Sequence, residues 1–171
     1  MTTLPVPSKR TVHGAAGLIR RGEEILLVHQ QDHDNPESNW ALPGGVVEHD
    51  ELVIEALVRE IREETGLIVA PPFRLLYVAQ HEDAHESILA LIYEIENWTG
   101  ELACDDPDGE ILEPRWLPES DAIARLERLT WRVMREPIVS YLRNETGPGA
   151  SWFYRAGKDN EAMLVTRIEG Y

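Results

Sequence analysis

The fold of this chain is decided by residues 44–67, which read GGVVEHDELVIEALVREIREETGL. The glycine pair at its start predicts a tight turn, and the apolar spacing that follows predicts an amphipathic helix. We expect the helix to begin near Asp50, a good N-cap residue, and to end at Gly66, because glycine adopts the left-handed conformation found after helices. The predicted buried stripe of this helix comprises Val53, Ala56, Leu57 and Ile61.

Three glutamates stand together on the predicted helix. Glu60, Glu63 and Glu64 occupy positions i, i+3 and i+4, so their carboxylates share one face. Like charges at this spacing repel by roughly 0.2–0.5 kcal/mol per pair on an exposed helix. A divalent cation such as Mg²⁺ removes that repulsion and binds phosphate oxygens as well. The spacing therefore predicts a metal site for phosphate chemistry.

The same stretch resembles the Nudix hydrolase signature, G-x5-E-x7-R-E-U-x-E-E-x-G-U, in which U is aliphatic. Its fixed positions are filled by Gly45, Glu51, Arg59, Glu60, Ile61, Glu63, Glu64, Gly66 and Leu67. The resemblance is strict over this segment and covers roughly residues 12–143 in general layout. The alternative is a solvated acidic helix after a glycine turn, which would leave the complete spacing unexplained.

The resemblance implies an α/β fold, an α/β/α sandwich with a mixed β-sheet. It also implies hydrolysis of a nucleoside diphosphate linked to another group X, with water attacking phosphorus and one to three Mg²⁺ or Mn²⁺ ions bound. The implied metal ligands are the carboxylates of Glu60, Glu63 and Glu64 and the backbone carbonyl of Gly44. Arg59 is expected to hold carboxylates such as Glu51 or Glu63 in place.

The signature does not determine which residues outside the helix act in catalysis or bind substrate. The general base implied by the resemblance is a glutamate of the signature, Glu63 or Glu64, or an acid on the loop before the last strand of the main sheet. In that loop Glu110 is our prediction and Glu113 its competitor. The remaining candidates for substrate contact are Trp40, by stacking on a base, Glu48, beside the metal, and two histidines of a predicted polar turn, His81 and His85, by contact with substrate phosphate.

The rest of the chain alternates strand-like and helix-like segments in a single predicted domain, residues 1–171. Strands are expected at 12–19, 24–29, 67–69, 73–79, 87–98 and 111–117, the fifth of these in the centre of the sheet. Helices are expected from about 120 to 129 and 130 to 143, the second kinked or broken at Pro137. Residues 1–10 are expected to form a loose arm. The pattern of residues 147–171 predicts a C-terminal β-hairpin extension that adds to the main sheet or to a partner subunit.

Composition limits the partners. The 171 residues carry a formal net charge of −15, which argues against binding duplex nucleic acid or an anionic membrane surface. Cys104 is the only cysteine, which fits a reducing compartment, and with neither a secretory signal nor a long apolar run we expect a cytoplasmic protein. The predicted partner is a small nucleotide substrate, and a homodimer is an open alternative to a monomer.

Two other functions compete with a hydrolase. One is a non-catalytic Nudix-fold module that senses a nucleotide, but such modules usually lose the carboxylates that are retained here. The other is an isoprenoid diphosphate isomerase, which needs a cysteine in the cleft, whereas Cys104 falls in a late acidic segment. Subfamily markers for ADP-ribose or dinucleoside polyphosphates, a Pro or Tyr downstream of the signature, are absent from residues 82–85. The sequence therefore does not specify X or the base.

Overall fold

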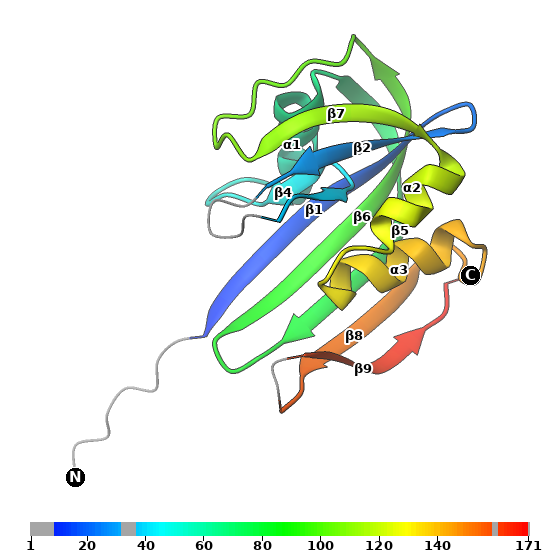
Figure 1. Ribbon diagram of the computed structural model, residues 1–171. Helices are drawn as coiled ribbons and strands as arrows, with labels where there is room; N and C mark the ends of the chain where they lie inside the picture. The colour runs from blue at the N-terminus through cyan, green and yellow to red at the C-terminus, as the bar shows by residue number, and fades with distance from the viewer. Residues whose placement is uncertain (1–8, 32–36, 159–160, 171) are drawn as a thin grey trace.

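A computed structural model describes residues 9–31, 37–158 and 161–170 of the chain (Figure 1). Along these residues nine strands and three helices follow one another. The elements, in chain order, are β1 (Arg10–Arg21), β2 (Glu24–Gln30), β3 (Asn39–Ala41), β4 (Gly44–Val46), α1 (Val53–Thr65), β5 (Ile68–Glu82), β6 (Glu86–Thr99), β7 (Ile111–Pro118), α2 (Glu119–Leu126), α3 (Arg132–Leu142), β8 (Ala150–Ala156) and β9 (Ala162–Ile168).

All nine strands join one mixed sheet in the order β3-β2-β1-β6-β5-β8-β9, with β4 paired to β1 and β7 to β2. The pairs β1–β6 and β5–β8 are parallel, and the other pairs are antiparallel. The predicted hairpin of β1 and β2 is confirmed and turns at Gly22, whose φ is 61°. The predicted central position of the strand at 87–98 is confirmed, because β6 lies between β1 and β5.

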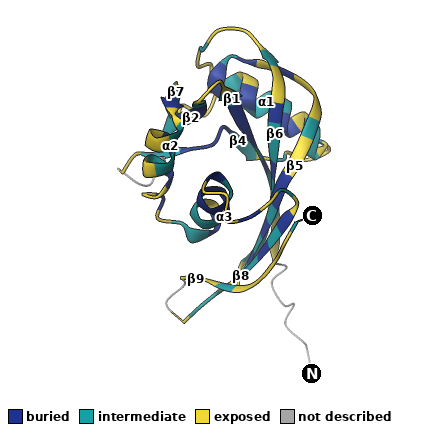
Figure 2. Ribbon diagram, turned by 90° about the vertical axis from the view of Figure 1, so that its right-hand side faces the viewer, coloured by how far each residue is buried: buried dark blue, intermediate teal, exposed yellow. Residues whose placement is uncertain are grey.

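Alternate residues of β1 face two separate cores. Ile19 packs with Leu57 and Ile61 of α1, whereas Leu18 packs on the other side of the sheet with residues of α2 and α3. Since successive side chains of a strand point to opposite faces, α1 covers one face of the sheet and α2 and α3 cover the other. Figure 2 shows the two layers edge-on, with the buried residues along the strands between them. The α/β/α arrangement with a mixed sheet is therefore confirmed.

Two segments predicted to be interrupted by proline are continuous in the structure. The segment around Pro71 and Pro72 is a bulge within the continuous strand β5, not a break between two strands. Proline has no N–H to give to the ladder, and a bulge is a position that needs none. A break at Pro137 is also wrong, because α3 continues through this residue, which is buried together with Val133 and Ile138 of the same helix. A kink at Pro137, the other predicted outcome, stays a prediction. Packing against the core retains the helix despite the hydrogen bond that proline removes.

The N-terminal end of the chain differs from the prediction in detail, whereas the C-terminal end agrees with it. Residues 1–8 of the expected arm lie outside the described residues, but Arg10 already belongs to β1, and Lys9 forms an ion pair with Glu82. At the other end β8 pairs with β5 and β9 pairs with β8, so the hairpin extends the main sheet, one of its two predicted roles. In the described part of the chain, no helix has the length and apolarity needed to cross a bilayer.

The C-terminal hairpin contributes to the core that lies under α3. Trp152 and Tyr154 of β8 are each 2% exposed and belong to the same cluster as Leu18. Replacing Trp152 by alanine removes a buried indole, and we expect the free energy of unfolding to fall by about 3–5 kcal/mol. Urea denaturation measures this loss. Met163→Ala on β9, a residue that is 55% exposed, is the matched control and should stay within about 0.5 kcal/mol of the parent chain. Equal stability of the Trp152 variant and the parent would show that the hairpin is dispensable.

Candidate active site

The glycine turn and α1 are joined by a short segment that sets where the helix begins. The N-cap is Leu52, not Asp50, whose φ of 65° lies in the left-handed region. Leucine has no side-chain acceptor, so the Glu55 carboxylate supports this end by accepting the Leu52 N–H at 2.8 Å. At the other end Gly66 has φ 75° and caps the helix as predicted. Between these ends the helix presents its glutamates toward β4.

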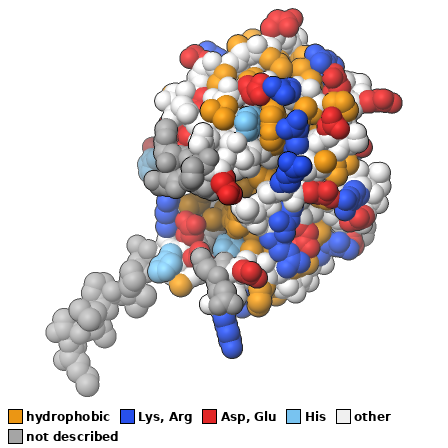
Figure 3. Space-filling model, in the orientation of Figure 1, with side chains coloured by type: hydrophobic (Ala, Val, Ile, Leu, Met, Phe, Trp, Pro, Cys, Tyr) orange, Lys and Arg blue, Asp and Glu red, His pale blue; other side chains and the backbone are white. Residues whose placement is uncertain are grey.

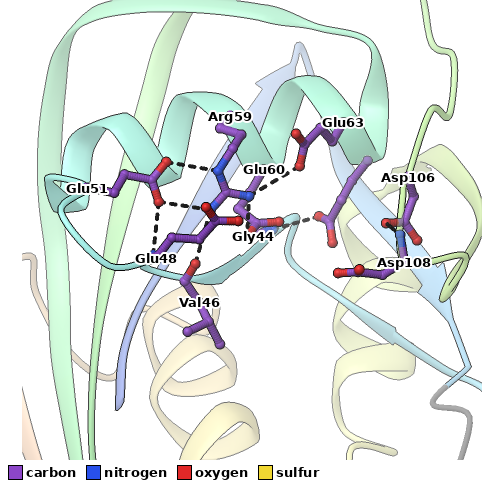
Figure 4. A network of polar contacts seen from close by, with 10 residues as sticks. Gly44, Val46, Glu48, Glu51, Arg59, Glu60, Glu63, Asp106 and Asp108 are labelled. Atoms are coloured by element: carbon purple, nitrogen blue, oxygen red, sulfur yellow. Dashed lines mark hydrogen bonds and ion pairs between the residues drawn. The ribbon is translucent and has the colours of Figure 1, made fainter. Parts of the chain in front are cut away.

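Arg59 is the centre of the polar network on this face of α1 (Figure 4). Its Nε and Nη2 donate to the two carboxylate oxygens of Glu51 at 2.8 and 2.9 Å. Its Nη1 donates to Glu60 at 2.9 Å and to Glu63 at 3.2 Å, and Nη2 also reaches the Val46 carbonyl at 3.1 Å. The expected pairing of Arg59 with Glu51 or Glu63 is therefore present with both, and one guanidinium fixes three carboxylates relative to the turn.

Glu64 is buried against the backbone of the glycine turn. It is 7% exposed, and its carboxylate accepts the Gly44 N–H at 2.7 Å. Gly44 has φ 146°, and a Cβ placed there would lie 2.2 Å from the Ala15 carbonyl oxygen on β1. A Cβ on Gly45 would lie 2.5 Å from the Glu60 carboxyl group. Two glycines in succession thus allow the turn to lie directly on the carboxylates of α1.

Burial raises the pKa values of these two glutamates. The pKa of Glu64 rises to about 8, because its carboxylate is desolvated and lies near the charges of Glu60 and Asp106, against the lowering effect of the Gly44 N–H. The pKa of Glu60 is also raised by burial, despite its hydrogen bond to Arg59. The pKa of Glu51, in contrast, is lowered by its hydrogen bonds to Arg59. The site therefore contains more carboxyl groups than the single positive charge of Arg59 can neutralise.

This surplus of acid fits a divalent cation. Among the described residues no three His, Cys, Asp or Glu side chains form a ready-made cluster for a metal ion. The hydrogen bonds explain why the carboxylates do not converge on one point, because Arg59 binds Glu60 and Glu63 while the Gly44 N–H binds Glu64. Carboxylate oxygens are hard ligands suited to Mg²⁺ or Mn²⁺, and a cation would relieve the desolvation cost of Glu64 and Glu60.

The loop after β6 adds two acids that the sequence did not single out. The N–H of Asp105 donates to the carbonyl of Glu63 at 2.8 Å, which fixes the loop against the end of α1. Asp106 and Asp108 then lie beside the glutamates of α1 (Figure 4). Their charges are among those that raise the pKa values of Glu64 and Glu60, respectively. The acidic run at residues 105–108 was the available signal, but its contact with α1 could not be read from the sequence.

Asp106 and Glu110 have structural roles in this loop. The Asp106 carboxylate accepts the N–H groups of Asp108, Glu110 and Ile111 at 3.1, 2.7 and 2.8 Å. The carbonyl of Glu110 accepts the N–H of Gln31 on the neighbouring segment at 2.8 Å. Glu110, the predicted base, is half-buried, and its backbone joins the loop to the sheet. Its catalytic role stays a prediction.

An apolar cavity of about 280 Å³ begins at the glycine turn. Gly44, Gly45 and Val46 line one end, and the walls come from β1, β5, β6 and the segment from α2 to α3. Figure 3 shows this region as a hollow with apolar side chains, beside a column of Lys and Arg side chains on the face that carries α2 and α3. The carboxylates of α1 and an apolar cavity thus lie on the two sides of the same glycine turn.

The other predicted substrate residues are dispersed. Trp40 is outside the lining of the apolar cavity, and its ring stacks on His29 with centroids 4.6 Å apart and lies 4.5 Å from the Arg125 guanidinium. Glu48 is exposed in the turn before α1. His85 is exposed in the β5–β6 turn, at the end of the sheet remote from α1 (Figure 1).

His81 is not in a polar turn, and this part of the prediction is wrong. The turn is confined to residues 83–85, and His81 lies within β5, where it is 6% exposed. The acidic and polar neighbours of His81 in the sequence suggested a turn, but alternation places its side chain on the buried face of the strand.

The raised pKa of Glu64 makes stability depend on pH. With a folded-state pKa of about 8 against an ordinary value of 4.5, the unfavourable charge appears only on deprotonation, so this group lowers stability as pH rises from about 4.5 to 8. In EDTA we expect Glu64→Gln to exceed the parent chain in unfolding free energy at pH 8, by on the order of 4 kcal/mol, and to differ little at pH 5. Urea denaturation at the two pH values tests this. An unchanged pH dependence in Glu64→Gln would contradict the assignment.

Similarity to known proteins agrees with this geometry. The NUDIX domain model matches residues 10–139. An ADP-ribose pyrophosphatase of Methanocaldococcus jannaschii is 38% identical over 92 residues, which make up 53% of each chain. Nudix hydrolase 6 of Arabidopsis thaliana is 32% identical over 125 residues, 68% of this chain and 42% of that protein. The chain thus spans about half the length of these curated relatives.

Solved structures show the same fold. A NUDIX hydrolase from Nitrosomonas europaea superposes with a TM-score of 0.66 at 19% identity, covering 81% of this chain and 93% of that one. The domain match over most of the chain, the mixed sheet and the glycine turn on a carboxylate-bearing helix agree with one another. The chain belongs to the NUDIX domain family.

Proposed function

We propose that this protein is a Mg²⁺-dependent pyrophosphohydrolase that cleaves a nucleoside diphosphate linked to another group X. The observation that carries the proposal is the buried Glu64 carboxylate, which lies on the Gly44 N–H beside Glu60 and the Arg59 network. A buried carboxylate with a raised pKa is costly to stability, and such groups occur preferentially where they act on a ligand. The relative named as an ADP-ribose pyrophosphatase acts on a substrate of this class, which supports the proposal.

The ligands proposed for the cation are the carboxylates of Glu60, Glu63 and Glu64 and the carbonyl of Gly44. A bound divalent cation would neutralise phosphate charge and lower the pKa of a coordinated water. In this account Arg59 keeps the carboxylates oriented, and it does not itself contact metal. Glu48 stays a candidate for an additional contact beside the turn.

In this proposal the apolar cavity and the carboxylates bind different parts of the substrate. The cavity offers a largely apolar surface, so it suits the nucleoside or another apolar part of the substrate. The turn at Gly44 and Gly45 then holds the diphosphate next to α1. For the proton of the attacking water, the loop acid Asp108 is the proposed acceptor, because it lies beside the glutamates of α1 and its charge acts on Glu60. Glu110 and the signature glutamates Glu63 and Glu64 are the alternatives.

Several features of the whole protein belong to the same proposal. A cytoplasmic location is supported by the single cysteine, Cys104, which is exposed and therefore suited to a reducing compartment. A single catalytic domain is supported by the common sheet that all described strands join. A homodimer stays a prediction, to be tested by light scattering. A non-catalytic nucleotide-sensing module is the alternative function, and it differs by binding nucleotide without releasing phosphate.

Activity is tested by phosphate or nucleotide release from a panel of nucleoside diphosphate derivatives with and without Mg²⁺. We expect turnover only with the metal, and a fall in kcat on the order of 10²–10³ or more in Glu63→Gln and Glu64→Gln, comparable to removing one group that stabilises a transition state. Glu23→Gln, in the β1–β2 turn, is the matched control and should retain full activity. Wild-type turnover in both site variants would refute the assignment of ligands, and nucleotide binding without any turnover would favour the sensing module.

The proposed base is tested by comparing Asp108→Asn with Glu110→Gln at saturating Mg²⁺. If Asp108 accepts the proton, its variant loses about 10²-fold or more in kcat with little change in KM, while Glu110→Gln stays within a few-fold of the parent. A large kcat loss in Glu110→Gln alone would move the role to Glu110. Loss in neither variant would leave the role with the glutamates of α1. Circular dichroism of both variants checks that the loop substitutions preserve the fold.

A further inference from the structure

The apolar cavity follows two strands from the glycine turn to the other end of the sheet. The register places Gly44 opposite Ala16 on β1, and Val12, four residues earlier on β1, opposite Ile88 on β6. Val12, Ala16 and Ile88 all line the cavity. Four residues of a strand span about 13 Å, so the cavity extends well beyond the reach of a diphosphate held at Gly44. Its far end must therefore meet another part of the substrate.

His81 lies next to that far end, just outside the residues that line the cavity. It pairs across the sheet with Ile88, and it follows Ala79, another lining residue, on the same face of β5. Both ring nitrogens of His81 are buried, and neither has a hydrogen-bond partner among the described residues. An unpaired buried polar group costs about 1–3 kcal/mol, so an imidazole without any partner is an anomaly that requires a reason.

Trp131 covers His81 on the side of the cavity. The two rings meet edge to face, with centroids 5.9 Å apart and an interplanar angle of 86°. Trp131 lines the apolar cavity and also the neighbouring groove of about 1050 Å³ between α3 and the C-terminal hairpin. It precedes the first residue of α3, at the end of the segment that links α2 to α3. A shift of its ring toward the groove would therefore uncover the imidazole to the cavity.

We propose that His81 is a specificity-determining residue, which hydrogen-bonds the polar edge of a nucleobase at the far end of the apolar cavity once the Trp131 ring has moved aside. The inference rests on the proposed function and adds to it the group that recognises the base. A neutral imidazole carries one hydrogen-bond donor and one acceptor on the same ring. It can therefore pair with the donors and acceptors along the edge of a nucleobase. The side chains that line the cavity are apolar apart from Gln30, Tyr77 and the indole N–H of Trp131, and His81 lies behind this lining against Trp131. An imidazole uncovered among apolar side chains suits a base and not a phosphate.

The decisive comparison is His81→Leu against the parent chain, with two readouts. The first is the melting temperature without ligand, and the second is calorimetric binding of AMP, GMP, CMP and UMP, which does not require turnover. We expect the variant to melt at the same temperature or higher, because an unpaired polar group has been replaced by an apolar one. We also expect about tenfold weaker binding of the mononucleotide that the parent prefers, with the preference among bases reduced. A histidine with a purely structural role would not weaken binding while preserving stability.

Further variants keep the test decisive. His81→Gln, which retains a donor and an acceptor, should recover part of the lost affinity. His13→Leu, an exposed histidine on β1, is the matched control and should bind like the parent. If His81→Leu fails to fold, His81→Phe, which keeps a planar ring, is judged by the same two readouts. Unchanged affinity and base preference in the folded apolar variant would overturn the inference.

The proposed hydrolysis is judged separately. Turnover that stays unaffected in kcat, with weakened base binding in His81→Leu, supports both proposals. A parent chain that binds mononucleotides through His81 but cleaves no derivative refutes the hydrolase and leaves the recognition role standing. A parent chain that cleaves derivatives with no dependence on His81 refutes only the inference. Absence of both binding and cleavage refutes the two together.

Discussion

The structure depends on one close approach, that of the Gly44–Gly45 backbone to the carboxylates of α1. A side chain on Gly44 would collide with the Ala15 carbonyl, and one on Gly45 would collide with the Glu60 carboxyl group. The approach brings the Gly44 N–H within 2.7 Å of Glu64 and leaves that carboxylate buried. The pairing of β4 with β1 fixes the turn, and the packing of α1 on β1 fixes the helix, so both partners are positioned by the same strand.

The burial of Glu64 against the glycine turn lowers the stability of the fold. A carboxyl pKa raised to about 8 corresponds to on the order of 5 kcal/mol against ionisation. Each fully buried aliphatic or aromatic side chain contributes about 1.5–3 kcal/mol in return, and the two cores on either side of the sheet contain many of them. The site therefore needs a fold with two apolar layers, because a buried acid is retained only where the surrounding packing offsets its cost.

Much of the fold and part of the site could be predicted from the sequence. The glycine pair, the carboxylate spacing, the helix end at Gly66 and the central strand at 87–98 are encoded within short segments, so local patterns were sufficient. Features that depend on tertiary contact were missed. Asp50 looks like an N-cap, but its backbone is left-handed and the helix begins after Leu52. Asp106 and Asp108 reach α1 because the loop hydrogen-bonds to the end of that helix, which no local pattern reveals.

His81 illustrates a different limit of sequence reasoning. Its neighbours Glu82 and Asp83 are polar, and polarity alone predicts a turn, whereas the ladder between β5 and β6 continues to Glu82. Only the register shows that His81 shares a face with Ala79 and lies opposite Ile88. The same parallel and antiparallel pairings that bring the glycine turn to α1 also set the distance from that turn to the imidazole. Since strands are stiff and their spacing is regular, the proposed substrate, if it bridges the two points, would be selected by its length as well as by its chemistry. The mixed sheet is thus more than a support for α1, because it fixes the separation between the place where a diphosphate would be cleaved and the place where its base would be recognised.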